Sequence, residues 1–187
     1  MYEIRKKVAE TSIYLYQQGL APGKSGNISL RKNGMVAITP TNISLRDVDV
    51  ESVAMVNLAG ELLSKGPIPS SELKLHLKIY NARKDVGGIV HTHSPYATGF
   101  ALAGEKIKRL EGFGPVEKEY LELVGYARPG SEELAQMVKS GLKKEDIIIM
   151  EGHGLVAVGP SIEEAALLSE WVEETAKTMF VSKMLQK

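Results

Sequence analysis

The stretch that decides the fold is Gly88-Ile89-Val90-His91-Thr92-His93, which is followed at once by Ser94-Pro95. Its apolar first half predicts a short strand, and Ser94 before Pro95 predicts the start of a helix over residues 94–103. Because side chains alternate along a strand, His91 and His93 are expected on one face, about 7 Å apart. One cation can bridge two imidazoles so placed, since a zinc–nitrogen bond is about 2.0–2.1 Å long. The alternative is a pair of ordinary polar residues near a strand end.

Helices and short strands are predicted on both sides of this stretch. The helices are expected over residues 2–18, 72–83, 94–103 and 131–140, and from 161 to about 183. The strands are expected over residues 27–31, 35–39, 53–57, 61–65, 88–93, 146–151 and 155–158, whereas residues 105–130 give no clear pattern. Asn33-Gly34 predicts a tight hairpin between the first two strands. Because most strands are joined by hairpins, the pattern predicts an α/β fold: a three-layer sandwich with a central, largely antiparallel sheet flanked by helices.

Composition and charge exclude several classes of protein. The chain has 187 residues, and its 23 Lys and Arg residues balance its 23 Asp and Glu residues. We therefore expect a single domain over residues 1–187, with no nucleic acid and no membrane as partner. The absence of cysteine excludes a disulfide scaffold, a thiolate metal site and a cysteine nucleophile. No apolar run reaches the ~18 residues of a transmembrane helix and the N-terminus is charged, so the expected location is the cytoplasm.

A third histidine makes a metal site the favoured interpretation. His153 stands between Gly152 and Gly154 and between two predicted strands, where the backbone can turn sharply. Three histidines on strand ends are typical of catalytic zinc sites that leave room for a substrate oxygen. Glu72 is the natural fourth ligand or a base, unless it is only a first-turn residue favoured by the helix dipole. His76, four residues further on, is expected to be a hydrogen-bonded helix histidine rather than a ligand.

Three loops have the composition of phosphate-binding sites. Ser25-Gly26-Asn27 offers exposed amides, Thr39-Pro40-Thr41-Asn42 ends a strand in the same way, and Ser70-Ser71 adds hydroxyls at a helix N-terminus. Free backbone amides at such places bind anions readily. Each loop alone also occurs in ordinary turns, so their occurrence together with three histidines is what points to a site.

In this order the motifs resemble those of the class II aldolase/adducin head family. They are Gly26–Ser29, Thr39–Thr41, Ser70–Glu72, His91–Ser94 and Gly152–Gly154, and the resemblance runs from about residue 4 to 183. It implies that the metal ligands are Glu72, His91, His93 and His153. It also implies that the phosphate is bound by Gly26, Asn27, Thr41, Asn42, Ser70 and Ser71. The implied cofactor is one Zn²⁺ per subunit, with Mn²⁺, Co²⁺ or Fe²⁺ as alternatives.

The sequence departs from the family pattern in three places. Asn42 stands where the family usually has glycine, and a non-glycine residue restricts the φ and ψ angles that the phosphate loop can adopt. The catalytic tyrosine of the sugar aldolases is missing from Leu110-Glu111-Gly112-Phe113, where Glu111 lies near the acid/base glutamate of the dehydratases. The longer C-terminal tail of the fuculose-phosphate aldolase and the ribulose-phosphate 4-epimerase is also missing. Glu72 and Glu111 are therefore the expected catalytic residues.

The resemblance implies a carbon–carbon lyase that acts on a sugar phosphate. The expected reaction is reversible cleavage of a phosphorylated ketose, such as L-fuculose 1-phosphate, to dihydroxyacetone phosphate and a small aldehyde. The alternatives are a dehydratase of the methylthioribulose-1-phosphate type, a pentulose-phosphate 4-epimerase and a non-catalytic adducin-like module. A homo-oligomer is expected, a cyclic tetramer with the site at a subunit boundary. The segment Glu105–Val124, with Phe113, Val116, Tyr120 and Leu121, is the part expected to reach the neighbour.

Overall fold

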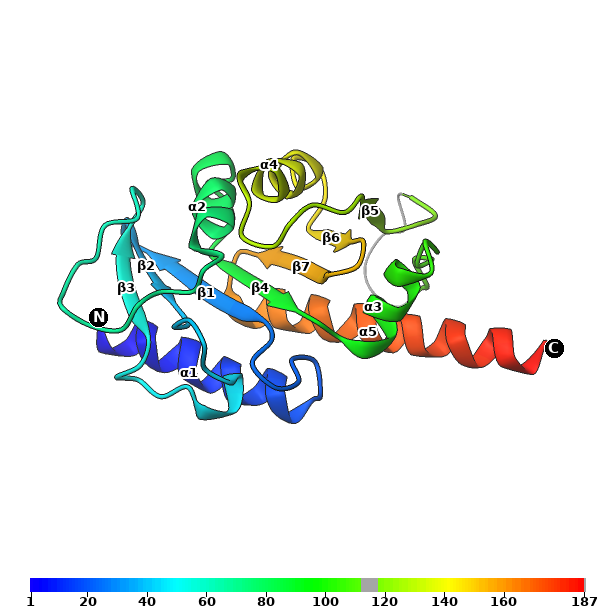
Figure 1. Ribbon diagram of the computed structural model, residues 1–187, viewed down its shortest axis with the longest axis horizontal. Coiled ribbons are helices and arrows are strands. Elements are labelled where there is room, and N and C mark those ends of the chain that lie inside the picture. The colour runs from blue at the N-terminus through cyan, green and yellow to red at the C-terminus, as the bar shows by residue number, and fades with distance from the viewer. Residues whose placement is uncertain (112–117, 187) are drawn as a thin grey trace.

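A computed structural model describes residues 1–111 and 118–186 of the chain. Within that part, a seven-stranded sheet has the order β3-β2-β1-β4-β7-β6-β5 (Figure 1). Every neighbouring pair is antiparallel except β5 and β6, which run parallel. The expected largely antiparallel sheet is therefore confirmed. The strands are β1 (Asn27–Lys32), β2 (Met35–Ile38), β3 (Ala54–Asn57), β4 (Gly88–Thr92), β5 (Glu122–Val124), β6 (Ile147–Met150) and β7 (Gly154–Gly159).

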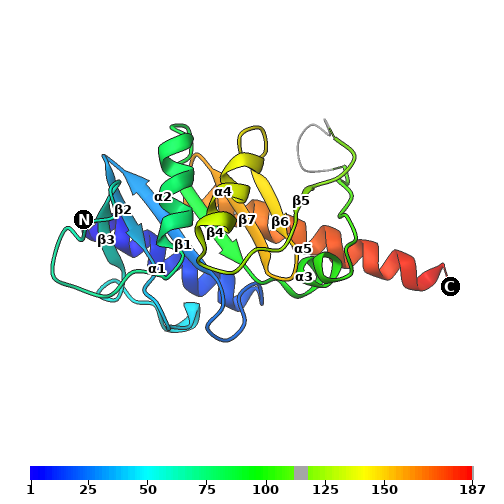
Figure 2. The same cartoon turned by 45° about the horizontal axis from the view of Figure 1, so that its top comes forward.

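Helices cover both faces of the sheet, which makes the three layers that were expected. One face packs against α2 (Leu73–Ala82) and α4 (Glu132–Gly141), and the other against α1 (Tyr2–Gln17) and α5 (Ile162–Leu185) (Figures 1 and 2). The helix α3 (Pro95–Leu102) lies beside α5, and a short 3-10 helix, η1, spans Leu45–Asp47. In the central strand β4, Ile89 belongs to the core beneath α2 and α4, whereas Val90 belongs to the core on the side of α1. The alternation of side chains along a strand thus divides the core into layers.

Local signals in the sequence set the ends of several elements. The hairpin between β1 and β2 turns at Asn33 and Gly34, which both have positive φ, 51° and 76°. That is the conformation a two-residue type I′ turn requires. The side chains of Ser131 and Ser161 cap α4 and α5 by accepting hydrogen bonds from Leu134 N and Glu164 N at 3.1 and 3.2 Å. The predicted hairpin is confirmed, and both helices begin within one residue of the predicted starts at 131 and 161.

One predicted strand is absent from the sheet, and one strand of the sheet was not predicted. Residues 61–65 do not form a strand: only an isolated bridge joins Val56 to Leu62, and Leu62 and Leu63 remain 50% and 40% exposed. No buried face is available to them at this edge of the sheet, so their apolar character does not secure a strand. Conversely, β5 was not predicted, because its three residues carry no period. It forms through pairing with β6, where Leu123 faces Ile149.

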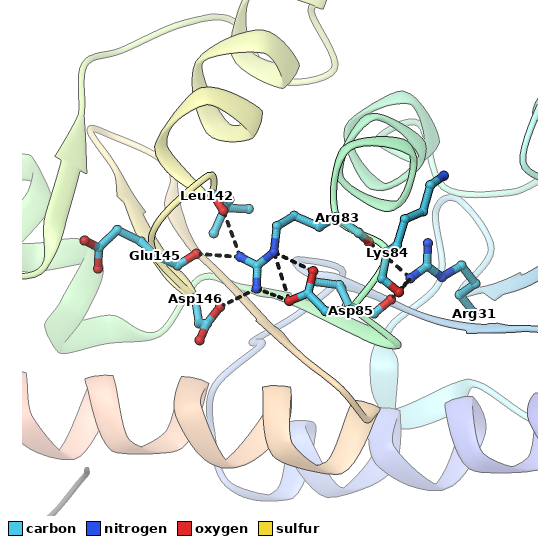
Figure 3. A network of polar contacts seen from close by, with 8 residues as sticks. Arg31, Arg83, Lys84, Asp85, Leu142, Glu145 and Asp146 are labelled. Carbon is cyan, nitrogen blue, oxygen red and sulfur yellow. Dashed lines mark hydrogen bonds and ion pairs between the residues drawn. The ribbon is translucent and has the colours of Figure 1, made fainter. Parts of the chain in front are cut away.

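A polar network holds the C-terminal end of α2 in place (Figure 3). The Arg83 guanidinium donates to the carbonyl oxygens of Leu142 and Glu145 at 2.8 and 3.1 Å and forms an ion pair with Asp146 at 2.9 Å. Arg31, from β1, donates to the carbonyl oxygens of Tyr80 and Lys84 at 2.7 and 2.8 Å. Arg31 thus binds a carbonyl in the last turn of α2 and one just beyond it, while Arg83 joins this end of the helix to the segment after α4.

Across residues 1–111 and 118–186, every helix is too short or too polar to span a lipid bilayer.

Candidate metal centre and active-site cleft

Three histidines meet at one end of the central strands. His91 lies in β4, His93 directly after it, and His153 in the turn between β6 and β7. Their candidate ligand atoms all lie within 4.8 Å of one another, and the Nε2 atoms of His91 and His93 are 3.0 Å apart. The pairing of β4 with β7 makes this meeting possible, because it aligns Thr92 with Leu155.

Glycines allow the backbone to bring these segments together. A Cβ at Gly154 would lie 2.2 Å from the carbonyl oxygen of Thr92, and one at Gly26 would lie 2.8 Å from that of His91. Gly26 also has a φ of 78°, which disfavours any other residue. Both glycines therefore permit a backbone approach that a side chain would block, and they bring two loops close to the histidines.

The electrostatics of the cluster favour the neutral form of two of its imidazoles, His93 and His153. Burial, together with the neighbouring histidines, lowers the pKa of His93 to about 3 and that of His153 to about 4. The Nδ1 atom of His91 donates to the carbonyl oxygen of Leu155 at 2.7 Å, which leaves its Nε2 lone pair directed at the cluster. A hydrogen bond of this kind on the outer nitrogen is the usual support of a metal-binding histidine.

Glu72 adds a buried carboxylate beside the histidines. Its Oε2 lies 3.2 Å from His91 Nε2 and its Oε1 lies 3.6 Å from His153 Nε2. Burial raises the pKa of Glu72, but His91 and the hydrogen bond from Asn27 outweigh this effect and lower the pKa to about 2. In the part of the chain that the structure describes, Oε1 is buried without a hydrogen-bond partner. Three clustered imidazoles and an unpartnered carboxylate oxygen form a donor set that fits a divalent cation.

A cleft of about 370 Å³ opens in front of these groups. All six residues predicted to bind phosphate line it, namely Gly26, Asn27, Thr41, Asn42, Ser70 and Ser71. Glu72, His93 and His153 line it too, whereas His91 is 1% exposed and lies behind the surface. The structure therefore brings the predicted metal-binding and phosphate-binding residues to one cavity.

The loop around Asn42 keeps the backbone shape that glycine would favour. Asn42 has a φ of 60°, in the left-handed region that asparagine tolerates better than most residues. The loop is also held by backbone hydrogen bonds of 3.0 Å from Thr41 N to Ile68 O and from Ser70 N to Thr39 O. Asn42 thus adopts the backbone conformation that glycine would adopt, and the loop stays packed against the Ser70-Ser71 segment.

Several lining residues were not singled out from the sequence. Lys24, Pro129 and Gly130 face the same cleft, and Lys24 is the one basic side chain that lines it among the residues described. The position of Lys24, two residues before Gly26 in a glycine-containing loop, is the signal that could have identified it. Nothing local marks Pro129-Gly130, which reaches the cleft only through the path of the chain between β5 and α4.

Glu111 has a different position from the other predicted site residues. Its side chain is exposed, and it does not line the cleft in the described chain. Its catalytic role stays a prediction that depends on a neighbouring subunit. Of the other residues expected at that boundary, Tyr120 is 41% exposed, and Phe113 and Val116 lie outside the described residues. Leu121 is only 2% exposed and packs in the core of its own chain, so that part of the expectation was wrong.

Comparison with known proteins places this geometry in a family. Residues 6–180 match the family described as Class II Aldolase and Adducin N-terminal domain. The chain is 39% identical over 166 residues to the L-fuculose phosphate aldolase of Methanococcus vannielii, covering 87% of this chain and 88% of that one. It is 32% identical over 183 residues to the 3-oxo-tetronate 4-phosphate decarboxylase of Pectobacterium atrosepticum, covering 95% and 84%.

A solved structure supports the same assignment at the level of the fold. A structure of L-fuculose 1-phosphate aldolase superposes with a TM-score of 0.92 at 24% identity, covering all of this chain (100%) and 89% of the other. The family match over residues 6–180 includes every histidine of the cluster and every loop of the cleft. The chain therefore belongs to the class II aldolase and adducin N-terminal domain family, and it is a lyase of the class II aldolase type.

Proposed function

We propose that the protein is a divalent-metal-dependent aldolase that cleaves a ketose 1-phosphate reversibly to dihydroxyacetone phosphate and a small aldehyde. L-Fuculose 1-phosphate is the representative substrate. The observation that carries the proposal is one cleft lined both by the hydroxyl residues Thr41, Ser70 and Ser71 and by Glu72, His93 and His153. The similarity to a relative named L-fuculose phosphate aldolase supports the choice of substrate class.

The metal would be held by His91, His93 and His153, with Glu72 as a ligand that can exchange. Zn²⁺ suits a site of three imidazoles and a carboxylate, and Mn²⁺, Co²⁺ or Fe²⁺ are alternatives. When bound, such a cation supplies a Lewis acid that polarises the ketose carbonyl and stabilises the negative charge that develops during cleavage.

The residues of the chain position the substrate and move its protons. The phosphate binds to the amides and hydroxyls of the loops at Gly26-Asn27, Thr41-Asn42 and Ser70-Ser71, so that the reacting carbons lie at the histidines. In cleavage the C3–C4 bond breaks, its electron pair passes to the ketone half, and the C4 hydroxyl loses its proton. C3 then takes up a proton. The unpartnered Oε1 of Glu72 is the oxygen that exchanges this proton, because Asn27 already holds Oε2.

The second proton transfer, at the C4 hydroxyl, requires another group. We assign it to Glu111 of a neighbouring subunit in a homotetramer, with Tyr120 as the alternative. The tetramer would also close the cleft against water, which favours chemistry that passes through a charged intermediate.

A decarboxylase is the second candidate function. The similarity to a protein named 3-oxo-tetronate 4-phosphate decarboxylase favours it over dehydration or epimerisation. Loss of CO₂ from a 3-oxo acid phosphate generates the same kind of charge beside the carbonyl, so the same site would serve both reactions.

An activity screen of the metal-loaded protein distinguishes these functions. The substrates are L-fuculose 1-phosphate, ribulose 1-phosphate, methylthioribulose 1-phosphate and a 3-oxo-tetronate 4-phosphate. An aldolase releases dihydroxyacetone phosphate from the first two, whereas a decarboxylase releases CO₂ from the last. If neither ketose 1-phosphate yields dihydroxyacetone phosphate, the proposed aldolase is contradicted.

A further inference from the structure

A row of buried polar side chains leads away from Glu72 between β1 and α2. It contains Asn27 and Ser29, on alternate positions of β1, and His76 and Tyr80, at successive turns of α2. Ser29, His76 and Tyr80 are 0% exposed and Asn27 is 7% exposed. The spacings of the two elements match: steps of two residues on the strand face steps of four on the helix. The site described above uses Asn27 and Glu72, but not the three residues behind them.

The hydrogen bonds along this row form a continuous chain. Asn27 Nδ2 donates to Glu72 Oε2 at 2.9 Å, and Asn27 Oδ1 lies 2.6 Å from His76 Nε2. His76 Nδ1 lies 2.7 Å from Ser29 Oγ, which lies 2.8 Å from the Tyr80 hydroxyl.

The neighbouring donor and acceptor groups determine which atom donates in the bonds of His76. An amide oxygen only accepts, so His76 Nε2 carries the hydrogen and donates it to Asn27. Burial lowers the pKa of His76 to about 3, so the ring is neutral and its Nδ1 accepts the hydroxyl hydrogen of Ser29. The Ser29 oxygen can then accept a hydrogen from Tyr80, whose hydroxyl lies 2.8 Å from Ser29 Oγ and 3.4 Å from the carbonyl oxygen of Gly87.

Reversal of the hydrogen bond between His76 and Asn27 would change the group that Asn27 presents to Glu72. If His76 held its hydrogen on Nδ1, its Nε2 lone pair would face the Asn27 oxygen at the same short distance. The amide would relieve that repulsion by rotating, and its oxygen rather than its NH₂ group would then face the carboxylate. Ser29 opposes this while it accepts the hydrogen of Tyr80, because its own hydroxyl hydrogen is then directed at Nδ1 and favours the tautomer with hydrogen on Nε2.

We propose that Ser29 and His76 are positioning residues that fix the orientation of the Asn27 amide and thereby hold Glu72 Oε2 beside the three histidines. The inference rests on the proposed metal centre, and it assigns a role to two residues that contact neither substrate nor metal. His76 acts through Asn27, as the outer hydrogen bond of a ligating histidine acts on its metal.

The test compares zinc affinities of full-length variants by competition with a chromogenic chelator. His76→Met and Ser29→Ala are expected to bind Zn²⁺ about 10–100-fold more weakly, the range typical for loss of an outer hydrogen-bond partner. His76→Gln is expected to restore most of the affinity, because its amide NH₂ can reach the place of Nε2. Ser12→Ala is the matched control: it also removes a fully buried hydroxyl, which donates to Val8 O at 2.7 Å on α1.

The outcomes separate the inference from a merely structural role. Thermal unfolding of each variant is measured alongside zinc affinity. The positioning role is supported if His76→Met and Ser29→Ala bind zinc weakly, His76→Gln restores the affinity, and Ser12→Ala binds zinc as the wild type does. Affinities equal to that of the wild type, or a loss in His76→Gln as large as in His76→Met, would overturn it. A wild type that binds zinc but cleaves no ketose phosphate contradicts the proposed reaction alone.

Discussion

His93 is the histidine of the cluster whose removal disturbs the fold least. It follows the last residue of β4, it is partly buried, and its ring contacts are with His91 and His153. We expect His93→Ala to lose the bound metal and the activity while its secondary structure stays unchanged, because two histidines and a carboxylate hold a divalent cation far less tightly than three and one. Elemental analysis and circular dichroism check this. A variant that retains the metal content of the wild type would exclude His93 as a ligand.

Lys24 adds the positive charge that the hydroxyl and amide groups of the cleft lack. Its side chain is exposed at the mouth of the cleft, near Ser25 and Gly26. We expect Lys24→Met to raise the KM for a ketose 1-phosphate by about 10-fold with little change in kcat. That is the lower end of the effect of a hydrogen bond to a charged group, because the site is open to water.

The control for this charge is Lys6→Met, which removes an exposed lysine on α1. Steady-state kinetics at constant ionic strength, together with inhibition by inorganic phosphate, compare the two variants. Equal KM values for Lys24→Met and the wild type would remove Lys24 from phosphate binding, and an equal rise in Lys6→Met would indicate a general effect of net charge.

The helix α2 joins the site to the rest of the molecule. It presents Glu72 at its N-terminal end, His76 one turn later, and an end that Arg31 and Arg83 hold. Burial of a neutral imidazole in this helix makes the free energy of unfolding depend on pH. The pKa of His76 is about 3 in the folded chain, whereas an unfolded histidine titrates near 6.5.

The sign of this pH dependence follows from the two pKa values. Between pH 6.5 and about 3 the unfolded chain binds a proton that the folded chain excludes, so stability is greatest above pH 6.5 and falls as the pH falls. We expect His76→Gln to reduce the slope of the unfolding free energy in this range by up to about 1.4 kcal/mol per pH unit. Urea unfolding of metal-depleted wild type and variant at several pH values measures it. Parallel curves would show that His76 is not excluded from protonation in the folded state.

The elements that could be predicted are those that local chemistry determines. The stripe of Ile4, Val8, Ser12 and Leu15 on α1 is buried as a helical period requires, and Asn33-Gly34 forms its hairpin. The strand β5 and the segment 61–65 could not be predicted, because pairing decides them: β5 pairs with β6 along three residues, whereas 61–65 makes only a single bridge to β3. Pairing between residues distant in the sequence is not encoded in either segment alone.

The same division applies to the site across the whole molecule. The histidines and the three phosphate loops could be found as motifs, because their residue types carry the chemistry. The row from Asn27 to Tyr80 could not, since it depends on how β1 faces α2. Lys24 and Pro129-Gly130 likewise join the cleft only after the chain has folded around it.

The end of α5 supports an assembly larger than one chain. The helix extends beyond the sheet at its C-terminus (Figures 1 and 2). Its last turns expose large apolar side chains: Phe180 is 45%, Met184 is 52% and Leu185 is 82% exposed. Exposed apolar surface of this extent is typical of contacts between proteins. We therefore expect a homotetramer, with a mass four times that of the 20.4-kDa chain by light scattering during size-exclusion chromatography.

The tetramer and the role of Glu111 can be tested separately. If Glu111 of a neighbouring subunit exchanges the proton of the C4 hydroxyl, Glu111→Gln lowers kcat by about 10²–10⁴-fold, the usual contribution of a general acid or base, and leaves the tetramer and its metal content intact. A fully active monomer would contradict both the assembly and the shared site. A tetrameric Glu111→Gln variant with the turnover of the wild type would contradict only the proton transfer. Tyr120, 41% exposed on the same segment, would then be the residue to replace with phenylalanine, because its phenol can supply a proton.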